Sequence, residues 1–480
     1  MKNDSVLEKG SFWELMLKLS VPTVVVILIM IIYNVADTYF IGQTGDPNKI
    51  SAISLGMPLF TILSGIGTLF GNGGTTSVSI ALGEGNKDKI RHVTGFCFTG
   101  GLIISLIFFA VVFGFSDKIA ILLGADAHTL ADTITYIKIF SFSAPLVLLS
   151  QCFGSIIRAD GDGATPMMAT LSGTMLNIVL DALFILVFHW DVFGAAFATV
   201  LGNVLTSVIL LALMFTKKRA FLPSITKEAF TTGIMIPVIT LGLPMTVSTI
   251  LSSVSGIIAN RMMMNYGSTY LAAQSVAGKV NMVITMLIMA ICMGMQPAIS
   301  FNFGAKNYTR MKSIIKSTGT FSVVLGLILT ALVFIFKNSL VTAFIDDADV
   351  ISIGQIFVLA GVIVGPVFGI YQLCQTSLQA TGKASYAIFA SLLDKGLIYI
   401  PVLIILNRIF GAYGVAFAHA VTMFFTIIIT VLLTLKWFRS LTIDSSSSKT
   451  PGSITSTTIH GTQKHQDISD EKQNAQSTCA

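Results

Sequence analysis

The hydrophobic positions of the chain fall into long runs that short polar connectors separate. An α-helix needs about 20 apolar residues to cross the hydrocarbon core of a bilayer, and the lengths of the runs scatter around this value. None of them alternates apolar and polar residues as a transmembrane β-strand does. The pattern therefore predicts an all-α integral membrane protein. The twelve predicted transmembrane helices are 21–40, 52–82, 93–115, 134–157, 167–188, 193–215, 234–258, 271–301, 321–336, 351–378, 387–406 and 415–435.

The first six spans and the last six are related by an internal repeat. A shift of 221 residues places the segment 83–90 on the segment 304–311, and the two share the pattern G-x-x-N-x-x-[KR]-[IM]. Because each half crosses the membrane an even number of times, the halves have the same orientation and are related by an axis along the membrane normal. We therefore predict two pseudo-symmetric six-helix lobes, residues 1–219 and 234–437, joined by a cytoplasmic linker at residues 220–233.

Basic residues indicate the side of the membrane on which each connector lies. Lys and Arg beside membrane spans concentrate on the cytoplasmic side, and the connectors of this chain are alternately rich and poor in them. The poor side carries only Lys49, Lys118, Lys138, Arg261, Lys337 and Arg408. Both termini are therefore predicted to be cytoplasmic, in a multi-pass protein of the plasma (inner) membrane. Residues 438–480 are polar and serine-rich, which predicts a disordered cytoplasmic tail.

Composition and missing motifs exclude several classes of function. The chain is 54% hydrophobic and only 11% charged, too apolar for a soluble globular protein. Its net charge of +6 follows from the topology and does not indicate a nucleic-acid partner. Gly278-Lys279 and Gly382-Lys383 lack the other residues of an ATP-binding loop, so ATP is not the evident fuel. We find no H-E-x-x-H and no paired cysteines, so no zinc site, no cofactor and no enzymatic activity are predicted.

Asn177 and Asp181 interrupt the otherwise apolar run of the fifth span. Their spacing of four places both side chains on one face of a helix. An ionised carboxylate at membrane depth is costly, so it normally points into a protein interior or a water-filled cavity. This face is therefore predicted to contribute to an ion site.

Two further spans carry polar residues on one helical face. Tyr33, Asn34 and Asp37 share a face of the first span, and Thr199 and Asn203 share a face of the sixth. Together with the pair in the fifth span they supply hard oxygen ligands, which suit Na⁺ or H⁺ better than a soft metal. A structural hydrogen-bonded cluster that seals the helices against one another is the alternative interpretation.

The acidic residues are not repeated in the second half of the chain. Asp37 falls on Ala259, and Asp181 falls on Val402. A purely architectural role would more easily predict that both halves keep such residues. The asymmetry therefore favours a functional role for the acids.

The second half has its own polar and flexible positions within the spans. Lys279 lies in the eighth span, and Asp394 and Lys395 lie in the eleventh. These charges are interpreted either as a neutralising ion pair or as a gate or substrate contact. Met286 and Met289 are either a pliable wall for varied ligands or apolar filler.

Four motifs carry a resemblance to a known family: D-T-Y-F-I-G at 37–42, R-A-D-G-D-G at 158–163, N-I-V-L-D at 177–181 and G-A-A-F-A-T at 194–199. With the two-lobe pattern, residues 10–438 resemble the multidrug and toxic compound extrusion (MATE) family, and within it the bacterial MepA-like branch. The resemblance implies that Asp37, Asn177, Asp181 and Thr199 form the Na⁺ or H⁺ coupling site. It also implies that Pro22 is the bend, and a possible hinge, of the first span.

Taken together, these features predict a secondary active multidrug efflux antiporter that exports cationic lipophilic compounds in exchange for Na⁺ or H⁺. Its expected partners are small organic cations and the lipid bilayer, and it is expected to function as a monomer. The candidate residues of the substrate cavity are Tyr33, Asn34, Asn203, Met286 and Met289. The alternatives are a lipid-linked oligosaccharide flippase, which would need a basic cavity for pyrophosphate, and a membrane-embedded enzyme, which would need a catalytic pair or a metal set.

Overall fold

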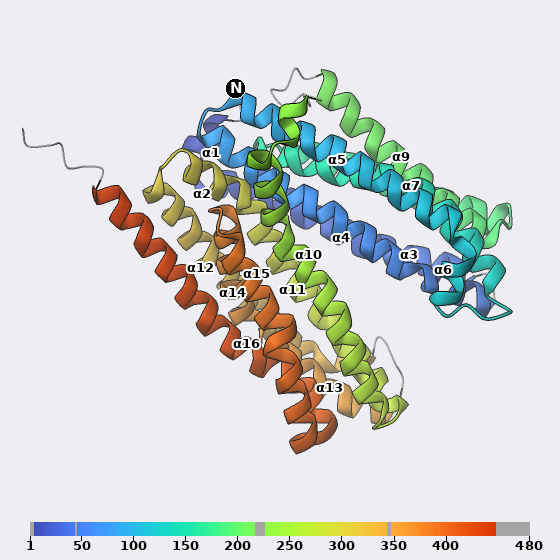
Figure 1. Ribbon diagram of the computed structural model, residues 1–480. Helices are drawn as coiled ribbons and strands as arrows, with labels where there is room; N and C mark the ends of the chain where they lie inside the picture. The colour runs from blue at the N-terminus through green and yellow to red at the C-terminus, as the bar shows by residue number, and fades with distance from the viewer. Residues whose placement is uncertain (1–3, 44–45, 217–225, 343–346, 448–480) are drawn as a thin grey trace, which may run out of the picture. The chain divides into compact units, whose positions relative to one another are not determined.

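The structure, a computed structural model, describes residues 4–43, 46–216, 226–342 and 347–447. These residues are almost entirely helical (Figure 1). The first half comprises α1 (Asp4–Lys9), α2 (Phe12–Leu15), the π-helical η1 (Met16–Ser20), α3 (Val21–Gly42), α4 (Pro47–Gly83), α5 (Lys87–Gly114), α6 (Ser116–Leu122), α7 (Leu130–Ala159), α8 (Ala164–Asp181), the π-helical η2 (Ala182–Val187) and α9 (Asp191–Thr216).

The second half begins with a short 3-10 helix and continues with long helices. They are η3 (Lys227–Phe230), α10 (Thr232–Met264), α11 (Ser268–Gly304), α12 (Tyr308–Thr342), α13 (Ala348–Val362), α14 (Gly365–Ala380), α15 (Ala384–Leu392), the π-helical η4 (Leu393–Leu397) and α16 (Tyr399–Ser447). The described residues up to Leu435 form one compact unit, and those from Lys436 to Ser447 belong to a second. α16 continues to Ser447, and the remainder of the predicted tail lies outside the described residues, as do residues 220–225 of the predicted linker.

Local sequence signals explain where the long helices begin. The Asp46 side chain accepts a hydrogen bond from the backbone N–H of Asn48 at the start of α4. Asn86 does the same for Lys89 at the start of α5, at 2.9 Å. Such caps satisfy backbone donors that the first turn of a helix leaves without a partner. Gly85, with φ of 71°, supplies the turn between these two helices.

Eleven segments of the described chain are long and apolar enough to cross a membrane. The last of them, Ala384–Leu441, contains Gly411, whose φ of 60° and ψ of −138° are not helical. This interruption divides the segment into two helices. The described residues therefore contain the predicted twelve spans in two six-helix lobes, and the all-α membrane fold is confirmed.

The tenth span differs in detail from the prediction, which gave one uninterrupted helix. α13 ends at Val362, and α14 starts at Gly365. Pro366 lies in the first turn of α14, where its missing N–H costs nothing. The apolar run is continuous in the sequence, so hydropathy alone does not show this break.

Pro22 lies at the beginning of α3, directly after the π-helical turn η1. Proline cannot donate a backbone hydrogen bond to the preceding turn, and the π-helical geometry occupies that turn. The structure thus shows irregular helix geometry next to Pro22. Its use as a hinge stays a prediction.

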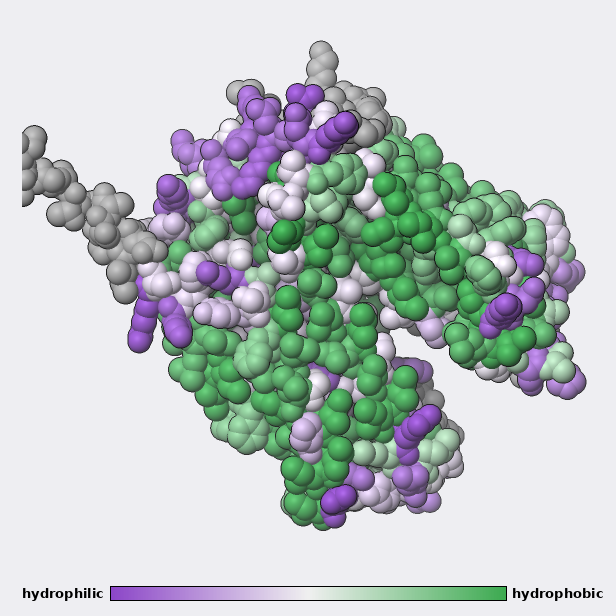
Figure 2. Space-filling model, in the orientation of Figure 1, coloured by the Kyte–Doolittle hydropathy of each residue, from purple (hydrophilic) through white to green (hydrophobic). Residues whose placement is uncertain are grey.

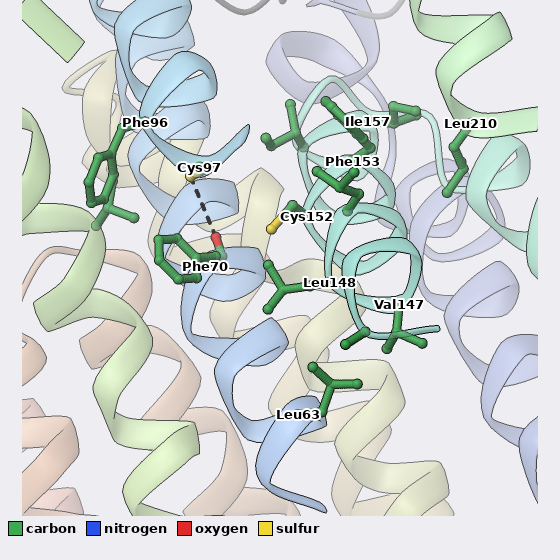
Figure 3. Packing of buried hydrophobic residues seen from close by; sticks show 14 of the residues in the cluster. Leu63, Phe70, Phe96, Cys97, Val147, Leu148, Cys152, Phe153, Ile157 and Leu210 are labelled. Atoms are coloured by element: carbon green, nitrogen blue, oxygen red, sulfur yellow. Dashed lines mark hydrogen bonds between the residues drawn. The ribbon is translucent and has the colours of Figure 1, made fainter. Parts of the chain in front are cut away.

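Each lobe is built around its own hydrophobic core. In the first lobe, α4, α5 and α7 enclose Leu63, Phe70, Leu148 and Phe153 (Figure 3). Cys97 adds a weak contact there, because its thiol lies 3.7 Å from the Phe70 carbonyl oxygen. The core of the second lobe gathers buried residues from α10, α11, α13 and α16. The first core also takes in Val238 at the start of α10, so the two cores correspond to the two lobes except where the lobes meet.

The two lobes meet through glycines that let helix backbones touch. A side chain at Gly73 of α4 would overlap the Val238 carbonyl of α10, and one at Gly242 would overlap the Leu69 carbonyl in return. A third such contact joins Gly83 to the backbone of α11. Small residues at helix interfaces commonly permit this close approach in membrane proteins.

These contacts lie in the half of each helix that is nearer to the basic connectors. α4 runs toward Lys87, and α11 runs toward Lys306. The Gln296 side-chain amide donates a 2.8 Å hydrogen bond to the Thr76 hydroxyl in the same region. The lobes are therefore joined on the side of the basic connectors. Figure 2 shows hydrophilic residues gathered near the N-terminal end and broad hydrophobic surfaces along the helices, as expected for a protein surrounded by lipid.

Candidate functional site

A cavity of about 890 Å³ is lined by residues of both lobes. Its volume is in the range of pockets that bind drug-sized molecules. The first lobe contributes residues of α3, α4, α7, α8 and α9, and the second contributes residues of α10, α11, α14, η4 and α16. The lining combines hydroxyls and amides with apolar side chains. Such a surface can bind a lipophilic molecule and still hold a few polar groups.

The hydroxyl of Thr199 on α9 is the meeting point of three helices. The Tyr33 hydroxyl of α3 lies 3.4 Å from it, and the Asn177 side-chain amide of α8 lies 3.5 Å from it as a donor. Thr199 itself donates to the Ala195 carbonyl oxygen at 3.0 Å, and Asn203 donates to the Thr199 carbonyl oxygen at 2.9 Å. The first, fifth and sixth spans are thus tied together at the polar face that the sequence predicts.

Close packing of α8 on α9 brings these side chains together. A methyl group added to Gly202 would lie 2.7 Å from the Gly173 carbonyl oxygen and 2.9 Å from the Asn177 Cβ. Only glycine allows the two backbones to approach this closely at Gly202. The short separation explains how Asn177 reaches across to the hydroxyl of the neighbouring helix.

Asp181 is fully buried, and its two carboxylate oxygens have no hydrogen-bond partner among the described residues. The side-chain oxygen of Asn177, one turn earlier, is also without a partner there. The Asp37 carboxylate is close enough to interact electrostatically with that of Asp181. Buried acceptors are normally satisfied, because leaving one unpaired costs about 1–3 kcal/mol. A bound cation or proton would satisfy the acceptors of this cluster.

The helix changes geometry directly after Asp181. α8 ends at this residue, and η2 continues as a π-helix. π-Helical turns are uncommon and frequently occur at functional sites. The irregular turn is an additional feature that distinguishes this part of α8 from an ordinary packing helix.

The structure brings most of the predicted residues into one region. Tyr33, Asn203, Met286 and Met289 line the cavity, as do Asn177 and Thr199, and the side chain of Asn34 lies outside the described residues. Asp37 and Asp181 are not among the described lining residues, but both carboxylates interact electrostatically with the Tyr33 phenol. The role of this set in ion or substrate binding stays a prediction.

Sequence reasoning missed the contribution of the fourth span. The phenol of Tyr136 on α7 lies close enough to Asp37 and Asp181 for electrostatic interaction. Gln151 and Arg158 of the same helix line the cavity, and the Arg158 guanidinium donates to the Ser155 hydroxyl at 2.7 Å. Gln151 interrupts an apolar run, which is the one sequence signal that could have indicated this helix. Tyr136 offered none, because tyrosines are common in membrane spans.

The charges of the second lobe are distributed unequally. Lys279 on α11 is exposed. The Lys395 ammonium lies 3.0 Å from the Asp394 carboxylate, and both residues line the cavity. An ion pair thus joins the chain neighbours Asp394 and Lys395, and the role of these charges as a gate or substrate contact stays a prediction. Among the residues that the structure describes, no group of three or more His, Cys, Asp or Glu side chains could hold a metal ion.

Comparison with family models identifies the architecture. The model described as MatE matches residues 22–183 and again residues 244–405. The chain belongs to the MatE family. The two matches of this family model fall on the two lobes, in agreement with the internal repeat.

Two MatE relatives from staphylococci resemble the chain over most of its length. The multidrug export protein MepA of Staphylococcus saprophyticus is 32% identical over 420 residues, which cover 87% of this chain and 93% of the relative. MepA of Staphylococcus aureus strain MSSA476 is 31% identical over 448 residues, which cover 93% of this chain and 99% of the relative. These similarities confirm the family and the MepA-like branch that the motifs indicated.

Solved MatE structures share the fold. One example is described as the outward-facing conformation of a multidrug resistance MATE family transporter of the MOP superfamily. It has a TM-score of 0.85 and 19% sequence identity, and the match covers 92% of this chain and 99% of that structure. At this identity the likeness supports the common fold.

Proposed function

We propose that this MatE protein is a secondary active multidrug efflux antiporter that exports cationic lipophilic compounds in exchange for Na⁺ or H⁺. The observation that carries the proposal is the buried Asp181 carboxylate, whose oxygens have no hydrogen-bond partner among the described residues. It lies one helical turn from Asn177, which lines a cavity of drug-like volume. The multidrug export function that names the two staphylococcal relatives supports the same proposal.

Exchange requires the ion and the organic cation to disfavour each other's binding. A cation bound near Asp37 and Asp181 neutralises the negative charge that an organic cation in the adjacent cavity would also find attractive. Occupancy by one therefore weakens the attraction for the other. In a one-for-one exchange of monovalent cations no net charge crosses the membrane, so the concentration gradient of the coupling ion drives export; each additional inward charge would gain about 2.3 kcal/mol from a membrane potential of 100 mV.

The cavity lies within a single chain, which bears on the oligomeric state needed for transport. Its lining comes from both lobes of one chain, so we propose that the monomer is functional. We further propose that the protein lies in the plasma (inner) membrane with both termini cytoplasmic, as the basic connectors indicate. In this orientation the lobe contacts close the cytoplasmic side. Rocking of the lobes would then expose the cavity alternately to the two sides, without covalent chemistry.

Transport of ethidium into or out of reconstituted vesicles tests the proposal. The purified protein is placed in proteoliposomes, and ethidium movement is followed by fluorescence under an imposed Na⁺ gradient, an imposed pH gradient, or neither. We expect uphill movement of the dye under one of the two gradients and none without a gradient. An ionophore that dissipates the effective gradient should stop it. Dye movement that is equal under all three conditions would contradict the antiport mechanism.

A further inference from the structure

The second lobe contributes one buried acid to the cavity, Asp394 of η4. Its side chain is 1% exposed, whereas that of its partner Lys395 is 23% exposed. The Tyr371 phenol is a hydrogen-bond donor beside the Asp394 carboxylate, and no other described side chain hydrogen-bonds to it. The lysine, which approaches to 3.0 Å, is thus the cation that balances this acid. The carboxylate retains free acceptor positions.

The backbone geometry makes this pair unusual. Adjacent residues of a regular α-helix point in different directions and do not face each other. Asp394 and Lys395 lie in the π-helical turn η4, which departs from that geometry. The Lys395 carbonyl oxygen also accepts a hydrogen bond from the Ser255 hydroxyl of α10. The irregular turn is therefore fixed to a neighbouring helix while it holds the two charges together.

Aromatic side chains surround the acid. The phenols of Tyr371 and Tyr399 interact electrostatically with Asp394. His419 interacts with both charges, and its ring lies edge-on to Tyr399 with centroids 6.3 Å apart. Aromatic faces attract cations in addition to the attraction of a carboxylate. An acid beside two tyrosines and a histidine is a suitable environment for an organic ammonium group.

The pair has no equivalent in the first lobe. The shift of 221 residues that relates the halves places Asp394 on Gly173 and Lys395 on Thr174. Both of these first-lobe positions also line the cavity. Corresponding positions of the two halves thus line the same cavity, and only those of the second lobe carry charged residues.

We propose that Asp394 is a second binding point for the cationic group of the substrate and that Lys395 is a built-in competitor which occupies it in the empty transporter. The inference rests on the proposed function and adds a specificity site to it. An organic cation that enters the cavity replaces the lysine ammonium at the carboxylate. Lys395, which is more exposed than its partner, then turns into the water of the cavity.

Competition explains why a charged pair suits this position better than a lone acid. A buried carboxylate without a cation is costly, so the lysine keeps the empty state stable. The same lysine sets a threshold, because a ligand must offer a positive charge to displace it. Neutral molecules of similar shape would bind to the apolar wall without this contribution.

Equilibrium binding to the purified protein in detergent tests the idea without any gradient. Ethidium is the cationic probe and Nile red the neutral one, both followed by fluorescence at alkaline pH. Removing the competitor in Lys395→Met should tighten ethidium binding about tenfold, and Asp394→Asn should weaken it about tenfold. The double variant should behave like Asp394→Asn, and Nile red binding should stay within about twofold of wild type.

A conservative variant and a stability measurement distinguish a substrate-binding role of this pair from a purely structural role. Lys395→Arg keeps a competing cation and should bind ethidium like wild type. Thermal unfolding of each variant reports on folding, and Lys395→Gln replaces Lys395→Met if the latter does not fold. Weaker ethidium binding in the folded Lys395 variant, or equal shifts for ethidium and Nile red, would overturn the inference.

Failure of the inference can be told apart from failure of the proposed function. If wild-type protein binds ethidium and the Asp394 and Lys395 variants bind it equally well, the second binding point is wrong and antiport is unaffected. If wild-type protein binds no organic cation at all, the proposed function and the inference are both wrong.

Discussion

The two lobes share one repeat but present different walls to the cavity. The first lobe keeps two carboxylates, Asp37 and Asp181, beside a hydroxyl and amide cluster. The second has hydrophobic residues at the positions that correspond to these acids, and it carries the Asp394–Lys395 pair elsewhere. Packing positions such as the glycines that follow the second span were kept in both halves. The differences between the lobes therefore favour a functional role for these charged residues, which stays a prediction.

The largest expected effect comes from removing a buried acid of the first lobe. Replacing the buried carboxylate in Asp181→Asn removes the charge that would hold the coupling cation. We expect gradient-driven ethidium transport in proteoliposomes to fall to the level of vesicles without protein. Glu84→Gln is the matched control in the same lobe, because Glu84 is a surface acid paired with Lys89 at 2.9 Å. Transport at the wild-type rate by Asp181→Asn would remove the basis for assigning the ion site to the first lobe.

The next effect concerns the backbone contacts that join the lobes. A methyl group in Gly242→Ala would overlap the Leu69 carbonyl, and relieving such overpacking costs about 1–3 kcal/mol. We expect a lower thermal unfolding temperature in detergent. Gly256→Ala on the same helix is the control, since no atom lies within 4 Å of the added methyl group. Its expected effect is a gain of about 0.4–1 kcal/mol from the less flexible unfolded chain. Equal unfolding temperatures of the two variants would argue against close backbone contact between the lobes at Gly242.

A smaller effect is expected from one hydrogen bond across the interface between the two lobes. Gln296 of the second lobe donates to Thr76 of the first at 2.8 Å. A double-mutant cycle with Gln296→Leu and Thr76→Val should give a coupling of about 0.5–1.5 kcal/mol in the free energy of unfolding. Additive effects of the two substitutions would show that this bond contributes nothing to holding the lobes together.

The smallest effect concerns the apolar wall of the second lobe. Met289 lines the cavity, and its flexible side chain can adapt to ligands of different shape. Met289→Ala should change the ratio of affinities for a bulky and a small organic cation by about threefold, measured by competition with ethidium. Met168→Ala is the control, because Met168 is 54% exposed and is not among the described lining residues. An unchanged ratio in Met289→Ala would assign this methionine to packing.

The fold could be predicted from the sequence because hydropathy and the repeat are strong, independent signals. The apolar runs gave the twelve spans, and the shift of 221 residues gave the two lobes. The broken tenth span was missed, because the break near Pro366 leaves the apolar run continuous. The π-helical turns were also missed, since they depend on how a helix packs against its neighbours.

The candidate site was predicted in part. Spacing along single helices indicated Asn177 with Asp181 and, separately, Tyr33. It could not show that these residues meet at the hydroxyl of Thr199, because that meeting depends on the close approach of α8 and α9. Tyr136 was missed for the same reason: its electrostatic interaction with the two acids arises only once the helices pack together.

The glycine contacts between the lobes have a consequence for turnover. Where main chain touches main chain, few side chains interlock, and the Gln296–Thr76 hydrogen bond is one that must break before the lobes part. If the lobes rock, these backbone surfaces would separate and meet again with few side-chain rearrangements. Speed of exchange and fidelity of closure would then both derive from the smallest residue in the chain.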